Sequence, residues 1–305
     1  MFDLTNPIYH DADKARVHLE TMLWPEGPVC PHCGGVENIT KLKGKSTRPG
    51  VFKCNQCRKP FTVTVGTVFE RSKIGLHKWL LGFRLMAGSK KGISAHQLHR
   101  SLGVTYKTAW FMAHRIREAM KDNNGGPLGG ENKVVEADET YVGGKQRNRA
   151  TRKVRAKQAV VSLVEREGKV RSYHVANVNA KTLRPLIVTT VDRKSHLMTD
   201  DSMVYTKVGN EFVGHTAVIH SKGEYVRKGG FAHSNTAENF FSIFKRGIIG
   251  IYHHVSEAHL GRYASEFDFR YNTRSMDDSE RTDEALKGAF GKRLMYRRAN
   301  EAAYA

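Results

Sequence analysis

Cysteine, proline and long apolar runs are all scarce in this sequence. Its 305 residues include four cysteines and eight prolines, which excludes both a disulfide-stapled secreted scaffold and a proline-rich disordered chain. No apolar run approaches the roughly 20 residues that cross a bilayer. The first residues also lack the basic and apolar regions of a signal peptide. We therefore expect a cytoplasmic protein with no membrane partner.

Acidic residues are in the minority as well. Thirty Asp and Glu stand against fifty Lys and Arg, so the net charge is +20 and the pI is near 9.9. A charge of this size attracts polyanions and releases their counterions on contact, which favours nucleic acid over an anionic membrane as the partner. The sequence has no G-x-x-x-x-G-K-[ST] phosphate loop, so nothing in it calls for ATP.

The four cysteines form two C-x-x-C pairs, Cys30 with Cys33 and Cys54 with Cys57. Each pair directs two thiolates to one ion, and four thiolates complete the tetrahedral shell of a zinc ribbon. Two disulfides are the alternative, which a cytoplasmic chain disfavours. Since four cysteines leave no open position, the zinc would be structural. We assign residues 1–70 to a short helical segment, within the first 25 residues, and this ribbon, whose closing strand would span residues 60–69.

Residues 71–122 change to the period of an amphipathic helix and predict three helices. Ser94 and Thr105 are candidate N-caps of the second and third helices, and Gly103 marks the turn between them. This pattern fits a helix-turn-helix, although any small helical bundle could show it. In a helix-turn-helix the last helix would meet the DNA major groove with its first turn, formed by Tyr106, Lys107 and Thr108.

A glycine-rich linker at residues 123–131 leads into a second predicted domain at residues 132–305. The domain begins with a strand, a hairpin, a helix and another strand, the opening order of an RNase H-like fold with a mixed sheet. The whole chain is therefore predicted to be a multidomain α+β protein. A basic run after the first strand is either a solvated surface or a set of phosphate contacts, and its residues are Lys145, Arg147, Arg149, Arg152 and Lys153.

Glu238 lies in an expected helix whose N-cap would be Asn235 or the threonine after it. Lys245 follows two turns later on the same face. A salt-bridged surface helix is the common explanation for such a pair. The alternative is that Glu238 joins Asp138 and Asp200, which two predicted strands carry at their ends, in one site.

These motifs resemble those of bacterial insertion-sequence transposases of the IS1595 type, the ISXO2-like group. The resemblance covers nearly the whole chain and rests on four stretches: the two C-x-x-C pairs, Asp138-Glu-Thr-Tyr-Val-Gly-Gly144 with its basic sequel, Thr199-Asp200, and the long segment Asn235–Ser256. It implies a DNA transposase that binds the ends of its insertion sequence and catalyses metal-dependent cleavage and strand transfer. The family's catalytic domain carries two aspartates, a third Asn or Glu, and a downstream Lys.

Carried over to this chain, the family pattern implies Asp138, Asp200 and Lys245, with Glu238 or Asn235 in the third place. We choose Glu238 because a carboxylate is the usual metal ligand, while the Asn235 carbonyl oxygen is the alternative. With Glu238 as the third ligand, the site would hold Mg²⁺ or Mn²⁺ ions. Transposon ends and target DNA are the implied partners, and pairing two ends implies at least a homodimer. The competing hypothesis is a catalytically inactive zinc and helix-turn-helix DNA-binding protein derived from a transposase.

Overall fold

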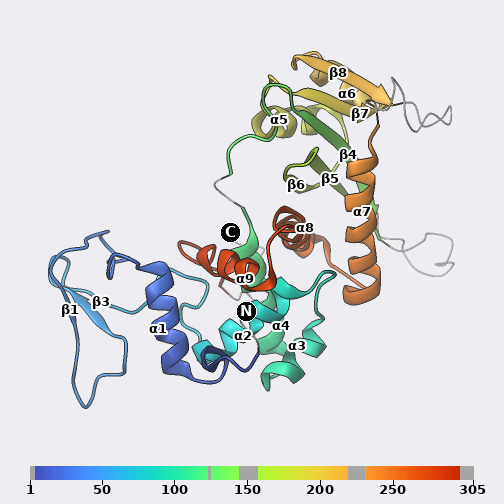
Figure 1. Cartoon of the computed structure of the whole chain (residues 1–305). Coiled ribbons are helices and arrows are strands. Elements are labelled where there is room, and N and C mark those ends of the chain that lie inside the picture. The colour runs from blue at the N-terminus through green and yellow to red at the C-terminus, as the bar shows by residue number, and fades with distance from the viewer. Residues whose placement is uncertain (1–3, 123–124, 144–156, 219–230, 232, 296–305) are drawn as a thin grey trace. The chain divides into compact units, whose positions relative to one another are not determined.

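The computed structural model describes residues 4–122, 125–143, 157–218, 231 and 233–295 (Figure 1). The chain divides into two compact units. The first contains the chain up to Lys121 together with the segment from Met276 onward, and the second runs from Asp122 to Ser275. Within the described residues, no helix combines the length and the apolarity that crossing a membrane requires.

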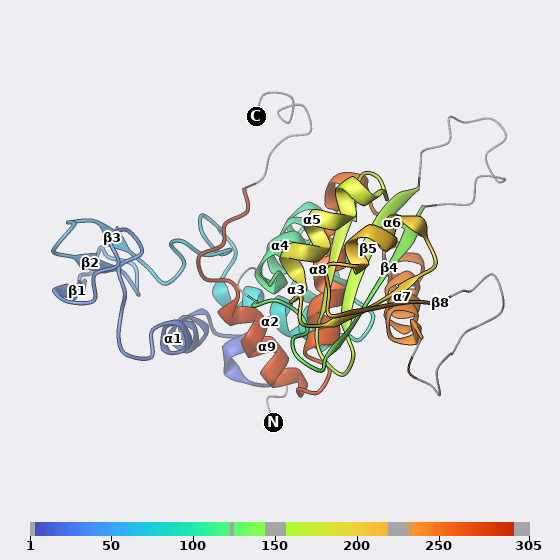
Figure 2. The same ribbon diagram turned by 90° about the horizontal axis from the view of Figure 1, so that it is seen from above.

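The first unit begins with α1 and a small antiparallel sheet (Figure 2). A 3₁₀ turn at Pro7–Tyr9 precedes α1 at Ala12–Leu23, and the strands, in the order β1-β2-β3, are Ile39–Lys41, Phe52–Cys54 and Pro60–Phe61. Trp24, Phe52 and Phe61 pack their rings 5.5 to 5.8 Å apart and form the sheet's small core. The helical N-terminal segment is confirmed. The closing strand is shorter than predicted, because hydrogen-bonded turns follow Phe61.

Three helices follow the ribbon, as predicted: α2 at Leu76–Gly88, α3 at Ala95–Leu102 and α4 at Tyr106–Met120. Ser94 caps α3 by accepting the N–H of Gln97 at 3.1 Å. Thr105 caps α4 by accepting the N–H of Thr108 at 3.3 Å. Gly103 ends α3 in the left-handed region, with φ of 59°, where glycine is unstrained. Local signals for caps and turns therefore located these helices.

The first unit also includes α9, at Asp278–Lys287, which packs against α2 and α4. Arg84 lies 3.4 Å from Asp278, and the Nε of Arg115 donates to the carbonyl of Leu294 at 3.0 Å. This arrangement differs from the predicted domain at 132–305, since the second unit ends at Ser275. The reason is long-range packing onto α2 and α4, which the local pattern of α9 does not encode.

The second unit is built on a mixed sheet with the strand order β6-β5-β4-β7-β8. Its strands are β4 at Val134–Val142, β5 at Gln158–Glu165, β6 at Val170–Val175, β7 at His196–Asp200 and β8 at Gly214–Val218. The pairs β6-β5 and β5-β4 are antiparallel, while β4-β7 and β7-β8 are parallel. The hairpin, helix and strand expected after β4 are all present.

Helices cover both faces of this sheet. On one face, α5 at Ala180–Thr190 and α6 at Met203–Gly209 pack on apolar residues of β4, β5 and β7. On the other, α7 at Asn235–Gly247, a π-helical turn at Ile248–Tyr252 and α8 at Glu257–Asn272 pack on Val160, Val164 and Val170 (Figure 1). Two buried apolar clusters therefore hold the sheet between helical layers and fix α7 beside β4 and β5.

Candidate active site and metal centre

The four cysteines meet at one point in the ribbon. Their Sγ atoms all lie within 4.8 Å of one another, with 3.6 Å between Cys30 and Cys57 and 3.7 Å between Cys33 and Cys54. Tetrahedral coordination with Zn–S bonds of about 2.3 Å requires sulfur atoms about 3.8 Å apart. The geometry therefore supports one structural zinc.

Asp138 and Asp200 lie at the same level on neighbouring parallel strands. In the register of β4 and β7, Glu136 is opposite Met198, and each aspartate follows two residues later on its strand. Residues two apart on a strand share a face, so both aspartates point to the face that α7 covers. Asp200 ends β7 as predicted. Asp138 does not end its strand, because pairing with β5 extends β4 to Val142.

The surroundings of Asp138 are acidic. Burial, followed by the charges of Glu139, Asp200 and Glu238, raises the pKa of its carboxyl to about 7. A hydrogen bond of 2.7 Å from the Glu139 N–H acts in the opposite direction. The three predicted carboxylates are therefore close enough to affect one another. They are not tightly gathered, since among the described residues only the four cysteines have ligand atoms all within 4.8 Å.

Asn235, Glu238 and Lys245 follow one another along α7, and all three are exposed. Asn235 is the first helical residue, Glu238 comes one turn later, and Lys245 lies about 10 Å further along the axis. Ser234 occupies the N-cap position and makes no side-chain cap bond, so the predicted cap at Asn235 or Thr236 is wrong. Both candidates for the third ligand thus lie in the first turn of α7. The negative charge of Glu238 contributes to the raised pKa of Asp138.

Glu136, a residue that sequence reasoning missed, holds the start of α7 in place of a capping side chain. Its carboxylate accepts the N–H of Ala237 at 2.9 Å and the hydroxyl of Thr236 at 3.0 Å. Arg166 Nε donates to it at 2.7 Å, and His233 Nδ1 lies 3.3 Å away. Glu136 is fully buried. An acidic residue inside an apolar strand was the only sequence signal for this role.

Glu136→Ala should lower the free energy of unfolding of the second unit by about 3 to 5 kcal/mol, because the half-buried Arg166 would lose its charge partner and the buried N–H of Ala237 its acceptor. Urea unfolding followed by circular dichroism measures the loss. Glu211→Ala is the matched control: it removes an ion pair to the exposed Arg184, at 2.6 Å, and should cost about 1 kcal/mol or less. Equal losses in the two variants would contradict the role of Glu136.

Glu139, the residue after Asp138 on β4, is half-buried. The hydroxyl of the buried Tyr205, on α6, donates to its carboxylate at 2.5 Å. Burial raises the pKa of Glu139, the Tyr205 hydrogen bond lowers it, and the Asp200 charge raises it. A fourth carboxylate therefore lies beside Asp138 and Asp200, directed to the opposite face of the sheet.

The predicted DNA-contacting residues fall in two places. Tyr106, Lys107 and Thr108 form the first turn of α4, where Tyr106 and Lys107 are exposed and Thr108 is half-buried. They line part of a pocket in the first unit. The predicted basic residues of the loop after β4 lie outside the described residues: Lys145, Arg147, Arg149, Arg152 and Lys153.

Two separate parts of the chain each match a domain of the same protein family. Residues 127–272 match the ISXO2-like transposase domain, and residues 10–60 match the transposase zinc-ribbon domain of IS1595. The chain belongs to the IS1595 transposase family. This confirms the predicted family and the zinc ribbon. The helices α2, α3 and α4 lie between the two IS1595 matches and outside both.

One relative of this IS1595 chain is described as an uncharacterized protein in transposable element ISH50 of Halobacterium salinarum. The alignment is 279 residues long with 27% identity, and it covers 84% of this chain and 90% of the relative. A pre-cleavage Mos1 transpososome structure aligns with 11% identity and a TM-score of 0.21, over 66% of this chain and 75% of the other. A Mos1 transposase paired-end complex aligns with 10% identity and a TM-score of 0.22, over 70% and 80%. These scores are too low to establish a common fold, so the IS1595 assignment rests on the sequence matches.

Proposed function

We propose that this IS1595 chain is a DNA transposase that binds the ends of its insertion sequence and catalyses metal-dependent cleavage and strand transfer. The observation that carries the proposal is the placement of Asp138 and Asp200 on one face of two neighbouring parallel strands, with the first turn of α7, which carries Glu238, held on that face. The sheet order β6-β5-β4-β7-β8 supports it, since the hairpin beside β4 and the parallel β7 are those expected of an RNase H-like domain.

Asp138, Asp200 and either Glu238 or Asn235 would hold the catalytic metal. Their donors are all oxygen atoms, which suits a hard divalent cation such as Mg²⁺ or Mn²⁺. The fit also follows from charge, because burial and neighbouring carboxylates raise the pKa of Asp138 to about 7 and a cation would relieve that repulsion. When bound, divalent metal activates the attacking oxygen and stabilises the leaving oxygen.

The other residues of the site would bind and orient DNA. Lys245, exposed two turns after Glu238, would contact a phosphate near the scissile bond as a point charge. Glu136 would position the third ligand by holding the start of α7 against β4. In hydrolysis, water oxygen bonds to phosphorus as the bridging P–O bond breaks; in strand transfer, a 3′-hydroxyl takes the place of water. Since one ester bond replaces another in strand transfer, that step needs no ATP.

DNA binding in this proposal falls mainly to the first unit. The helices α2, α3 and α4 would act as a helix-turn-helix, with Tyr106, Lys107 and Thr108 in the first turn of the recognition helix. The loop after β4 would add sequence-independent phosphate contacts. Because transposition joins two ends to one target, the active form would be at least a homodimer on DNA.

The proposed activity is tested with a labelled duplex that carries the terminal sequence flanking the chain's own gene. Purified protein should cut this duplex at the element's end when Mg²⁺ or Mn²⁺ is present, and gel-shift measurements should show binding under the same conditions. Tight binding without any cleavage by the wild-type chain would instead favour the inactive DNA-binding hypothesis.

The metal-dependent cleavage rate should rise with pH up to about 7 and level off above it. The pKa of Asp138 is raised to about 7 from an ordinary value of 3.8, so below that pH protons compete with a subsaturating metal for its carboxylate. The rate should therefore fall by up to about tenfold for each pH unit below 7. Single-turnover cleavage across a pH series measures this, and a rate unchanged between pH 5 and pH 7 would contradict the assignment.

A further inference from the structure

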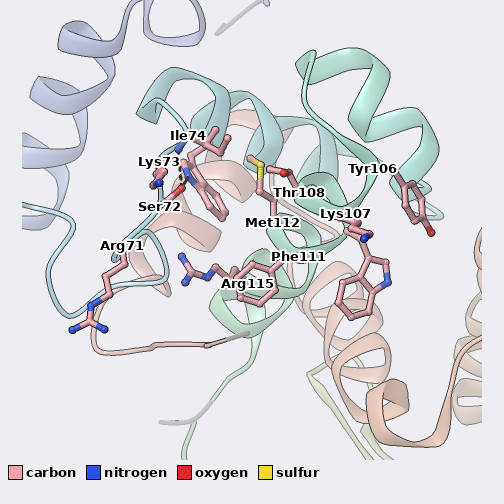
Figure 3. Close-up of a pocket in the computed structure, with 12 residues that line it drawn as sticks. Arg71, Ser72, Lys73, Ile74, Tyr106, Lys107, Thr108, Phe111, Met112 and Arg115 are labelled. Atoms are coloured by element: carbon pink, nitrogen blue, oxygen red, sulfur yellow. Dashed lines mark hydrogen bonds between the residues drawn. The ribbon is translucent and has the colours of Figure 1, made fainter. Parts of the chain in front are cut away.

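A pocket lies in the first unit, beside the start of α4. Its volume is about 500 Å³, and the segment Arg71–Ile74 and the first turns of α4 form its walls. Figure 3 shows Arg71 and Lys73 on one side of Phe111, with Lys107 on the other. Trp110 also lines it. A volume of this size suits a small planar group and excludes a duplex.

Hydrogen bonds hold the walls of the pocket in position. Ser72 Oγ accepts the indole N–H of the buried Trp79 at 2.9 Å and the backbone N–H of Ile74 at 3.1 Å. Arg115, from α4, donates to the carbonyls of Val68 and Glu70 at 2.8 and 3.0 Å, and so ties the helix to the chain just before Arg71. The pocket is therefore formed before any ligand arrives, which lowers the entropy cost of binding.

The lining combines aromatic rings with positive charge. Trp110 and Phe111 are half-buried, whereas Arg71, Lys73 and Lys107 are exposed at the rim. No Asp or Glu is among the described residues that line the pocket. Arg71 is also held at φ of 56°, an uncommon conformation for a residue other than glycine. Aromatic walls with a basic rim suit a ligand that has a planar ring and a negative charge.

We propose that this pocket binds an unpaired nucleotide at or next to a transposon end, with its base on Trp110 and Phe111 and its phosphates on Arg71, Lys73 and Lys107. The inference rests on the proposed function, because it assigns one subsite within DNA binding. Aromatic rings beside a basic groove are the usual way in which proteins hold single-stranded nucleic acid. The excess of positive charge argues for this occupant over an apolar peptide.

Fluorescence anisotropy with three labelled duplexes tests the pocket: one blunt, one with a short thymidine overhang, and one with an abasic overhang of the same length. The thymidine overhang should tighten binding about tenfold over the blunt duplex, and the abasic overhang should restore little of this gain, because it keeps the phosphates and lacks the bases. Trp110→Ala should remove the gain while blunt-duplex binding remains. Trp110→Phe should keep most of it, which separates loss of stacking from misfolding.

Two further measurements, tryptophan quenching and salt dependence, test whether the overhang binds in this pocket. Trp24 and Trp79 are buried, with 7% and 1% exposure, so the half-buried Trp110 should account for quenching of tryptophan emission by the thymidine overhang. That quenching should disappear in Trp110→Phe. Lys107→Ala should instead weaken binding of the thymidine and abasic overhangs, which both keep the phosphates, and flatten the slope of log K against log salt for these two duplexes by about 0.9.

Equal affinity of the wild type for all three duplexes would overturn the pocket proposal and leave the transposase proposal intact. Failure to bind any duplex would overturn both. A third outcome is that Trp110→Ala leaves all three duplex affinities unchanged and alters only the oligomeric state of the free protein, measured by sedimentation. The pocket would then be a contact between copies of the chain, and the nucleotide proposal would be wrong.

Discussion

Asp138→Ala and Asp200→Ala should each reduce end cleavage and strand transfer by at least about 10³-fold while leaving binding to the element's ends intact. Each change removes a metal ligand proposed for the chemistry, and it relieves repulsion between the site and DNA phosphates. The assay is cleavage of the labelled terminal duplex with Mg²⁺ or Mn²⁺, with a gel shift in parallel. Asp201→Ala is the matched control, because Asp201 adjoins Asp200 but is exposed, and this variant should keep full activity.

The same assay distinguishes the two candidates for the third ligand. If Glu238 binds metal, Glu238→Ala should be as inactive as Asp138→Ala, and Asn235→Ala should lose activity only in part. If Asn235→Ala is instead the inactive variant and Glu238→Ala loses activity only in part, Asn235 is the third metal ligand and Glu238 positions the first turn of α7. Full activity in Asp138→Ala would reject the whole active site.

Removal of zinc should unfold the ribbon, because the binding free energy of a structural zinc site, about 10 to 16 kcal/mol in small domains, is also folding free energy. The purified chain should contain one zinc, and Cys54→Ser should abolish its binding. Hydrogen exchange of residues 28–61 should then rise to the rate of an unfolded segment. His32→Ala is the control, since His32 lies between two of the cysteines, is exposed, and adds nothing to a complete four-thiolate shell.

Zinc content well below half an equivalent in freshly purified protein would contradict this account of the ribbon. So would unchanged hydrogen exchange after all four cysteines are replaced by serine. Trp24, Phe52 and Phe61 would then be sufficient to hold the three short strands together without a metal.

Sequence reasoning succeeded where the signal was local. Ser94 and Thr105 cap the helices that follow them because an N-cap acts within three residues of its own position. Spacing alone likewise predicted that the two C-x-x-C pairs converge, since each pair directs its own two thiolates. The strands that carry Asp138 and Asp200 were also predicted, although the extent of β4 beyond Asp138 was not.

Features that depend on distant contacts were missed. Glu136 looked like one more charged neighbour of Asp138, and only the fold brings Arg166 and the start of α7 to it. Similarly, the local sequence of α9 does not reveal that this helix packs with α2 and α4 in the first unit. Hydrophobic periodicity reports which face of an element is buried and not which partner covers it.

The most direct test of the metal site is a manganese titration of the zinc-loaded chain, followed by electron paramagnetic resonance of the free ion. The wild type should bind Mn²⁺ saturably above pH 7 and progressively more weakly below it, because protons compete for Asp138. Asp138→Asn should bind at least about tenfold more weakly, with its zinc content unchanged. Equal Mn²⁺ affinity in the wild type and Asp138→Asn, or no saturable binding in either, would contradict the proposal that these carboxylates form a catalytic metal site.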